Sequence, residues 1–472
     1  MRRPALLVAL GALLTAACAR DAARPEVAAP SYFYAIAPPA QGSWTLRVEA
    51  RFDRAPSDHL VAPEAAGVLR EVSLLEGHAF RPVPRSGEAW VVPECRTSCT
   101  VGYEIDLAAL ATACRRMDCA HRVGDAVIGS ASSWMLRPEP AGDAPVRIEV
   151  HGGDPRRMVT GLRRGAHGSY ALRTHELGEA SYTAFGEVRE AKLDVPGATL
   201  DVALLGPPLA MGDDGARAWV KEAAGCVARL FGHFPVAATV FVVPVRGADE
   251  VVFGRVLSLA GASVALLFGS ETRPESEHAD WVTVHELFHL GTPSFVGEGH
   301  WLEEGLATYY EPILRTRAGW MSEADLWRHF AREMPRGLRK PGDPPSLEER
   351  DDIDSTYWGG ALFALLADVR IREATRGARS LDDAMRAALA QLGDATHSAT
   401  LADFLRVGDA ATGTPVLTEV HAHDAMAGEP VDLEGLWRAL GVGVNADGSV
   451  TLHDDAPMAA ARRAIAGAPA GK

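Results

Sequence analysis

The chain has 472 residues, of which 47% are hydrophobic, and its formal net charge is −15. This composition is typical of a globular protein, and the length is too great for one hydrophobic core, so we expect roughly two to four domains. The acidic balance argues against a nucleic-acid-binding protein, because no basic stripe offsets the repulsion from phosphates.

The N-terminal segment has the pattern of a secretory signal peptide, predicted over residues 1–17. Two arginines precede an apolar run, residues 5–14, that is too short to span a bilayer. Residues 14–18 resemble a bacterial lipobox, in which the cysteine, here Cys18, is lipidated after cleavage; the alternative is an ordinary signal peptide that is cut nearby. Residues 18–32 are rich in proline and alanine and are expected to form a flexible tether. We therefore predict an exported protein of the bacterial cell envelope, an outer-membrane lipoprotein facing the periplasm or the cell surface and held to the membrane by its lipid.

Four further cysteines lie close together in the sequence: Cys95, Cys99, Cys114 and Cys119. A cluster of this kind can bind zinc, but the oxidising compartment of an exported chain favours two local disulfides, and all three possible pairings remain open. Cys226 lies on the apolar face of a helix predicted over residues 214–230, and we expect it to be a core residue.

Residues 33–205 alternate apolar and polar side chains with a period of two. The segment 43–52 is a clear example, and segments 145–152 and 198–206 repeat the pattern. This period is typical of half-buried strands. Because the predicted strands are short and separated by Gly, Pro and Asp turns, we predict an N-terminal antiparallel β-sandwich.

The pattern changes to mixed α/β and then to mainly helical after residue 206. Apolar runs at residues 238–245 and 262–269 predict buried strands, and residues 355–375 predict one long helix. Residues 380–392 predict another helix with Ser380 as its N-cap. The chain is thus predicted to be a multidomain α+β protein that ends in a small helical region, residues 400–472.

Two histidines four residues apart predict a metal site. On a helix His285 and His289 lie on one face and can bind the same ion, and Glu286 can reach a water on that ion. A catalytic zinc usually has three protein ligands, and Glu303 and Glu304 follow after a short loop. The alternatives are a surface helix with two solvated histidines and a structural zinc, for which His300 could be a fourth ligand.

The sequence HELFH followed by WLEEGLATYY resembles the gluzincin zinc metallopeptidases, which have HExxH, a loop, and a tryptophan-led helix with a Glu-Gly pair. The resemblance implies a thermolysin-like α/β plus helical catalytic domain, residues 206–399, and one zinc ion per chain. It also implies that Glu286 is the general base and that Thr308, a small hydroxyl residue one turn after the Glu-Gly pair, orients the glutamate ligand. The residues at the three ligand positions are His285, His289 and Glu304.

Residues 356–389 resemble the glycyl aminopeptidase family, and aminopeptidase N is a more distant likeness. Tyr357 matches the family's tyrosine that hydrogen-bonds the oxyanion, whereas Gly359 stands at the lysine of its Tyr-x-Lys-Gly signature. The sequence also departs from these families before the zinc helix. Aminopeptidase relatives read the substrate's free amine there with a glutamate-containing motif, but residues 253–267 contain no glutamate.

The sequence therefore predicts a zinc-dependent metallopeptidase that hydrolyses a peptide or protein substrate with zinc-activated water. An endopeptidase or an unassigned peptidase fits the residues better than a glycine-specific aminopeptidase, and the choice between endopeptidase and aminopeptidase stays open. A non-catalytic surface lipoprotein that uses the peptidase fold as a binding scaffold is the alternative. It is disfavoured because the ligands and the base are all present. A zinc buffer is disfavoured because the 16 histidines are scattered.

Overall fold

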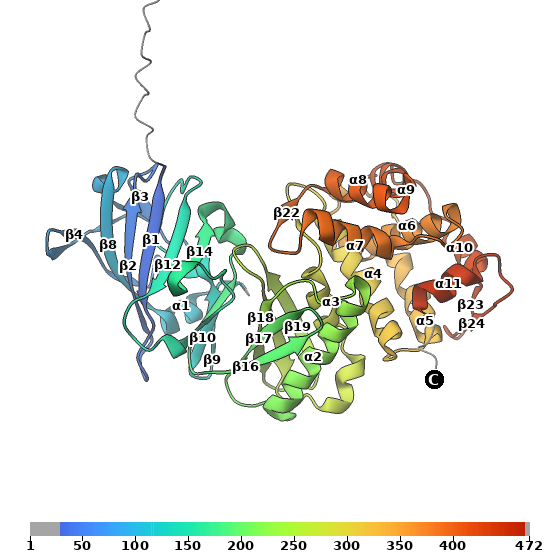
Figure 1. The fold of residues 1–472 in the computed structure, drawn as a ribbon, viewed down its shortest axis with the longest axis horizontal. Helices are drawn as coiled ribbons and strands as arrows, with labels where there is room; N and C mark the ends of the chain where they lie inside the picture. Colours follow the sequence, from blue (N-terminus) through green and yellow to red (C-terminus); the bar gives the residue numbers. More distant parts are fainter. Residues whose placement is uncertain (1–28, 115, 117, 468–472) are drawn as a thin grey trace, which may run out of the picture.

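The computed structural model describes residues 29–114, 116 and 118–467 (Figure 1). The predicted signal peptide, Cys18 and most of the predicted tether lie outside the described residues. The tether prediction extended to residue 32, whereas strand β1 (Ser31–Ala37) begins inside it, because Tyr32 and Tyr34 alternate into the core. Within the described ranges, every helix is too short or too polar to cross a bilayer.

A seven-stranded sheet forms the centre of the N-terminal unit, in the order β14-β12-β1-β2-β8-β4-β5. Its neighbours pair antiparallel except β1 and β12, which are parallel, so the sheet is not purely antiparallel as predicted. In β2 the odd residues Arg47 to Arg51 are exposed and the even ones are buried, which confirms the alternation. The other strands are β2 (Thr45–Asp53), β4 (Leu69–Glu76), β5 (Ala79–Pro82), β8 (Ser98–Asp106), β12 (Pro145–Val150) and β14 (Tyr170–Arg173).

Two four-stranded sheets complete this unit, so its three sheets do not confirm the predicted sandwich. The first has the order β11-β3-β7-β6, with β3 (His59–Val61), β6 (Arg85–Ser86), β7 (Ala89–Val91) and β11 (Arg137–Pro138). The second has the order β13-β15-β10-β9, with β9 (Ala120–Val123), β10 (Ala126–Ser130), β13 (Met158–Thr160) and β15 (Tyr182–Gly186). Helix α1 (Leu107–Ala113) and the disulfides Cys95–Cys99 and Cys114–Cys119 lie here too. The prediction of two local disulfides is confirmed.

The next unit is built on a five-stranded sheet in the order β16-β17-β18-β20-β19. Strands β17, β18 and β20 are parallel, and the two outer strands are antiparallel to their neighbours. The predicted domain boundary at residue 205 falls inside this sheet, because β16 and β17 precede it and β17 pairs with β18. The bounds are β16 (Val188–Val195), β17 (Ala198–Leu205), β18 (Ala238–Val245), β19 (Val251–Leu257) and β20 (Ser263–Gly269).

An apolar cluster joins the two units. It contains Ile128 and Tyr182 from the sheet of β13-β15-β10-β9 and Phe241 and Leu257 from the five-stranded sheet, all buried. Hydrogen bonds cross the same junction, including one from the Tyr182 amide to Ser263 Oγ at 2.9 Å. The junction therefore fixes the N-terminal unit against the sheet that ends in strand β19.

Helices cover the other end of the molecule, in yellow to red in Figure 1. One continuous core runs from Val195 to Ala466, so the predicted C-terminal region shares its core with the unit built on the five-stranded sheet. The helix predicted over residues 355–375 begins as a π-helical turn, Asp354–Gly359, before α6 starts. The helices are α2 (Gly212–Phe231), α3 (Val282–His289), α4 (His300–Ala318), α5 (Glu323–Glu333), α6 (Gly360–Ala374), α7 (Leu381–Leu392), α8 (Leu401–Thr412), α9 (Val416–Val420), α10 (Leu433–Leu440) and α11 (Ala459–Ala466). Short strand pairs are β21 (Ser294–Phe295) with β22 (Ser398–Ala399), and β23 (Val442–Val444) with β24 (Val450–Leu452).

Candidate metal centre

Asp280 starts the helix that carries the HExxH motif. Its Oδ1 accepts hydrogen bonds from the amides of Val282 at 2.8 Å and Thr283 at 3.3 Å, which leaves two amides of the first turn of α3 paired. Its Oδ2 accepts from Trp219 Nε1 of α2 at 2.7 Å. Asp280 thus fixes both the start of α3 and its place against α2. The sequence interpretation missed it, although aspartate is a favoured cap residue.

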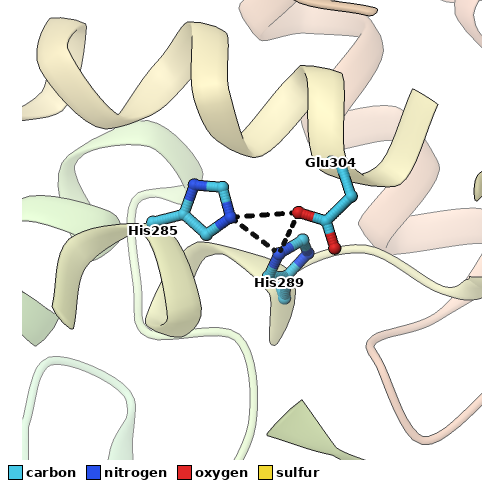
Figure 2. Close-up of side chains that lie close together, drawn as sticks. All are labelled: His285, His289 and Glu304. Atoms are coloured by element: carbon cyan, nitrogen blue, oxygen red, sulfur yellow. Dashed lines mark hydrogen bonds and ion pairs between the residues drawn. The ribbon is translucent and has the colours of Figure 1, made fainter. Parts of the chain in front are cut away.

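Three side chains from α3 and α4 converge on one point (Figure 2). His285 Nε2 lies 3.2 Å from Glu304 Oε2 and 3.3 Å from His289 Nε2. His289 Nε2 lies 3.6 Å from the same carboxylate oxygen. All three are largely shielded from solvent, with side-chain exposures of 4%, 15% and 16% for His285, His289 and Glu304. The structure therefore brings together the three ligands that the sequence predicted.

The charges of this group suit a bound cation. Burial acts to lower the pKa of His289, but the Glu304 carboxylate outweighs it and raises that pKa to about 9. Burial acts to raise the pKa of Glu304, but His289 and His285 hold it far below its usual range. The group therefore favours positive charge between the ligand atoms. Two imidazoles and a carboxylate form the donor set of a catalytic zinc, which keeps a fourth position open, so the residues fit zinc.

The two neighbouring glutamates of α4 have different roles. Glu303 Oε1 accepts a hydrogen bond from the Phe295 amide at 2.5 Å, and its Oε2 lies 3.5 Å from His300 Nδ1. Glu303 thus holds the loop between α3 and α4 and does not join the ligand group. His300 lies outside the ligand group as well, and its side chain is 74% exposed. It is a cleft residue, not a fourth ligand.

The glycine of the Glu-Gly pair, Gly305, is required by the packing of α4 against α6. A Cβ atom on Gly305 would lie 2.3 Å from the backbone of Gly360, and a Cβ on Gly360 would lie 2.1 Å from the Trp301 carbonyl oxygen. Helices α4 and α6 therefore meet backbone to backbone at these two glycines, a contact that no other residue type permits. This close approach sets the π-helical turn before α6 beside the ligands.

Tyr357 lies in that π-helical turn, where such turns often mark functional sites. Its ring stacks on His285 with a centroid distance of 6.0 Å and an angle of 15° between the planes. Burial, followed by the nearby Glu304 charge, raises the pKa of the Tyr357 hydroxyl above its usual range. The hydroxyl therefore stays protonated and can donate a hydrogen bond into the cleft.

Glu286 of α3 lines the cleft and lies against strand β19. Its carboxylate makes no hydrogen bond to the described part of the chain, and burial raises its pKa. Gly254 of β19 leaves it room: a Cβ there would lie 2.2 Å from Glu286 Cγ and 3.1 Å from its Oε1. The absence of a side chain at Gly254 thus sets the position of the predicted base.

The cleft around these residues has a volume of about 390 Å³. Strand β19, α3, α4, Tyr357 and, from the N-terminal unit, Glu179 line it. Thr308 is buried, but its Oγ1 makes no hydrogen bond within the described chain, so the contact expected with Glu304 is not formed. Neither Glu179 nor Gly254 carried a signal in the sequence, because both reach the site through the packing of distant segments.

Comparison with solved structures supports the fold. An aminopeptidase N family protein from Idiomarina loihiensis matches with a TM-score of 0.65 and 16% identity, over 88% of this chain and 79% of that one. A two-domain M1 zinc metallopeptidase, a mutant bound to L-arginine, matches with a TM-score of 0.50 and 13% identity, over 85% of this chain and 96% of that one. No protein-family model and no curated protein matches the chain. The likeness shows a fold shared with these two structures and confirms the multidomain α+β architecture.

Proposed function

We propose that the chain is a zinc-dependent metallopeptidase that hydrolyses peptide bonds. The observation that carries the proposal is the convergence of His285, His289 and Glu304 at a cleft that Glu286 also lines. The fold supports it, because the solved structures that share this fold are described as an aminopeptidase N family protein and an M1 zinc metallopeptidase. One zinc ion per chain is held by the two histidines and Glu304.

The residues divide the work of hydrolysis. A zinc ion at this site would lower the pKa of water and polarise the carbonyl of the scissile bond. Glu286 takes the proton of the attacking water and gives it to the leaving amine. The Tyr357 hydroxyl donates a hydrogen bond to the carbonyl oxygen as negative charge develops on it. The side chains of His285, His289 and Glu304 are largely shielded from solvent, and electrostatic interactions are stronger where water is excluded.

The substrate is a peptide or protein outside the cytoplasm. Strand β19 lacks the glutamate with which aminopeptidase relatives read a free amine, which favours cleavage within a chain over removal of an N-terminal glycine. The signal-like N-terminus with its lipobox at Cys18 supports export and a lipid anchor in the bacterial cell envelope. The two local disulfides agree with an oxidising compartment.

The test compares the wild-type chain with Glu286→Gln, which keeps the size and all three ligands. We expect one zinc per chain in both, and a fall in kcat of about 10²–10⁴ in the variant, which is the usual contribution of a general base. Zinc content and hydrolysis of a mixed peptide library are measured on the same preparations. Zinc in both proteins with no turnover by the wild type would instead support a binding scaffold.

A further inference from the structure

Arg255 is the one lysine or arginine among the described residues that line the cleft. The same lining contains the carboxylates of Glu179, Glu286, Glu303 and Glu304. Two of these serve catalysis and metal binding, and Glu303 holds the loop after α3. A single guanidinium in a cleft that is otherwise acidic is therefore a feature that the hydrolytic machinery does not use.

The guanidinium of Arg255 is poorly satisfied by the protein. Its Nε is buried and has no hydrogen-bond partner in the described chain. One terminal nitrogen lies 3.8 Å from Glu179 Oε1, which is too long for a hydrogen bond. The side chain is still 41% exposed. Because arginine carries five N–H donors, several of them remain available to a ligand in the cleft.

Arg255 lines the same cleft as Glu286 and the three side chains of the metal centre. It follows Gly254, which lies against the Glu286 carboxylate, and it pairs with Ala265 in the register of β19 and β20. Its neighbour Glu179 is fixed from the other side, since Ala180 forms a bridge to Leu259 at the junction of the two units. Arg255 and Glu179 therefore lie near each other across the junction of the two units, 3.8 Å apart and without a hydrogen bond between them.

We propose that Arg255 is a specificity-determining residue that binds a carboxylate of the peptide substrate beside the scissile bond. The planar guanidinium binds a carboxylate through two parallel hydrogen bonds, and arginine serves this purpose better than lysine. A singly charged carboxylate suits the site better than a dianion, because four glutamates line the same cleft. The carboxylate is either the C-terminal one or an Asp or Glu side chain. The inference rests on the proposed function, since it requires a cleft that binds peptides.

The experiment measures peptide binding by calorimetric titration in the full, zinc-loaded chain with Glu286→Gln, so that no peptide is cleaved. One pair of probes is Ala-Phe-Ala as the free acid and as its C-terminal amide. The second pair is two N-acetylated, C-amidated pentapeptides that differ only in a central Glu or Gln. Arg255→Leu and Arg255→Lys are added to this background, and Glu179→Gln serves as the matched control. The same peptides are also tested for cleavage by the unmutated chain.

We expect the Glu286→Gln protein to bind the carboxylate member of one pair about tenfold more tightly than its uncharged partner. A partly exposed charge-assisted hydrogen bond contributes about this much. The pair that shows the preference identifies the source of the carboxylate. Arg255→Leu should abolish the preference, Arg255→Lys should keep part of it, and Glu179→Gln should keep it or increase it.

Equal binding of both members in both pairs, or a preference that survives Arg255→Leu, would overturn the proposal. So would an equal loss in Arg255→Leu and Glu179→Gln, because it would mean that Arg255 serves only its protein partner. If the unmutated chain cleaves no peptide while the Arg255-dependent preference is present, the proposed function fails and the carboxylate site stands.

Discussion

The two walls of the cleft are built in different ways. The helical wall, α3 and α4 with the π-helical turn, draws its ligands and base from short motifs, in which His285, Glu286 and His289 occupy a single helical turn. The strand wall, β19 with Glu179, is assembled from segments about 75 residues apart that meet only at the junction of two units. The proposed catalytic residues are thus encoded locally, while the proposed substrate-binding Arg255 is placed by tertiary packing.

The largest effect expected on the helical wall, apart from loss of the base or the metal, is that of Tyr357→Phe. Removing one donor to the developing oxyanion should lower kcat by about 10²–10³. KM and zinc content should change little, because the hydroxyl acts in the transition state and is not a metal ligand. Steady-state kinetics on a peptide that the wild type cleaves give this result, and a change in KM alone would contradict the assigned role.

Gly254→Ala tests the strand wall with a single methyl group. The new Cβ would lie 2.2 Å from Glu286 Cγ, so the carboxylate must move. A displacement of about 1 Å at a catalytic group can cost about 10²-fold in rate. We expect that loss in kcat with an unchanged thermal midpoint, because Glu286 can rotate away without disturbing the core. Full activity would show that Glu286 does not act from the position seen here.

Gly305→Ala tests whether the helical wall depends on the close approach of α4 and α6. Its Cβ would meet the Gly360 backbone at 2.3 Å, and backbone cannot turn aside as a side chain can. We expect the free energy of unfolding to fall by about 3 kcal/mol, at the upper end for overpacking. Gly225→Ala is the matched control, since nothing lies within 4 Å of its Cβ in α2. It should be neutral or stabilise by up to about 1 kcal/mol. Equal effects in urea denaturation would refute the packing argument.

The sequence predicted the elements that have a strong period and the site residues that lie close together. Strands β2, β18 and β20, helix α7 and the ligands His285, His289 and Glu304 are where the patterns placed them. It could not place Glu179 beside Arg255, because that contact depends on the apolar cluster between two sheets. The parallel pairing of β1 with β12 was missed for the same reason: alternation reports the buried face of a strand and not the direction of its neighbour.

Two further features of the site could not be predicted from the sequence. The helix predicted over residues 355–375 starts as a π-helical turn, which its composition does not signal. The backbones of distant segments approach it closely, at Gly337 beside Trp358 and at Gly305 beside Gly360. Thr308 occupies the position expected for a partner of Glu304, yet its hydroxyl makes no hydrogen bond in the described chain. A residue that matches a family motif in sequence does not have to form the hydrogen bond that the motif implies.

The measurement that tests the central claim most directly is zinc content in Glu304→Ala and Glu303→Ala, compared after mild dialysis of both proteins. The two glutamates are adjacent on α4, but only Glu304 lies with the histidines, and Glu303 binds the Phe295 amide. We predict that Glu304→Ala loses its zinc and its peptidase activity, while Glu303→Ala keeps one zinc per chain. Zinc retained by Glu304→Ala, or lost equally from both, would contradict the assigned metal centre.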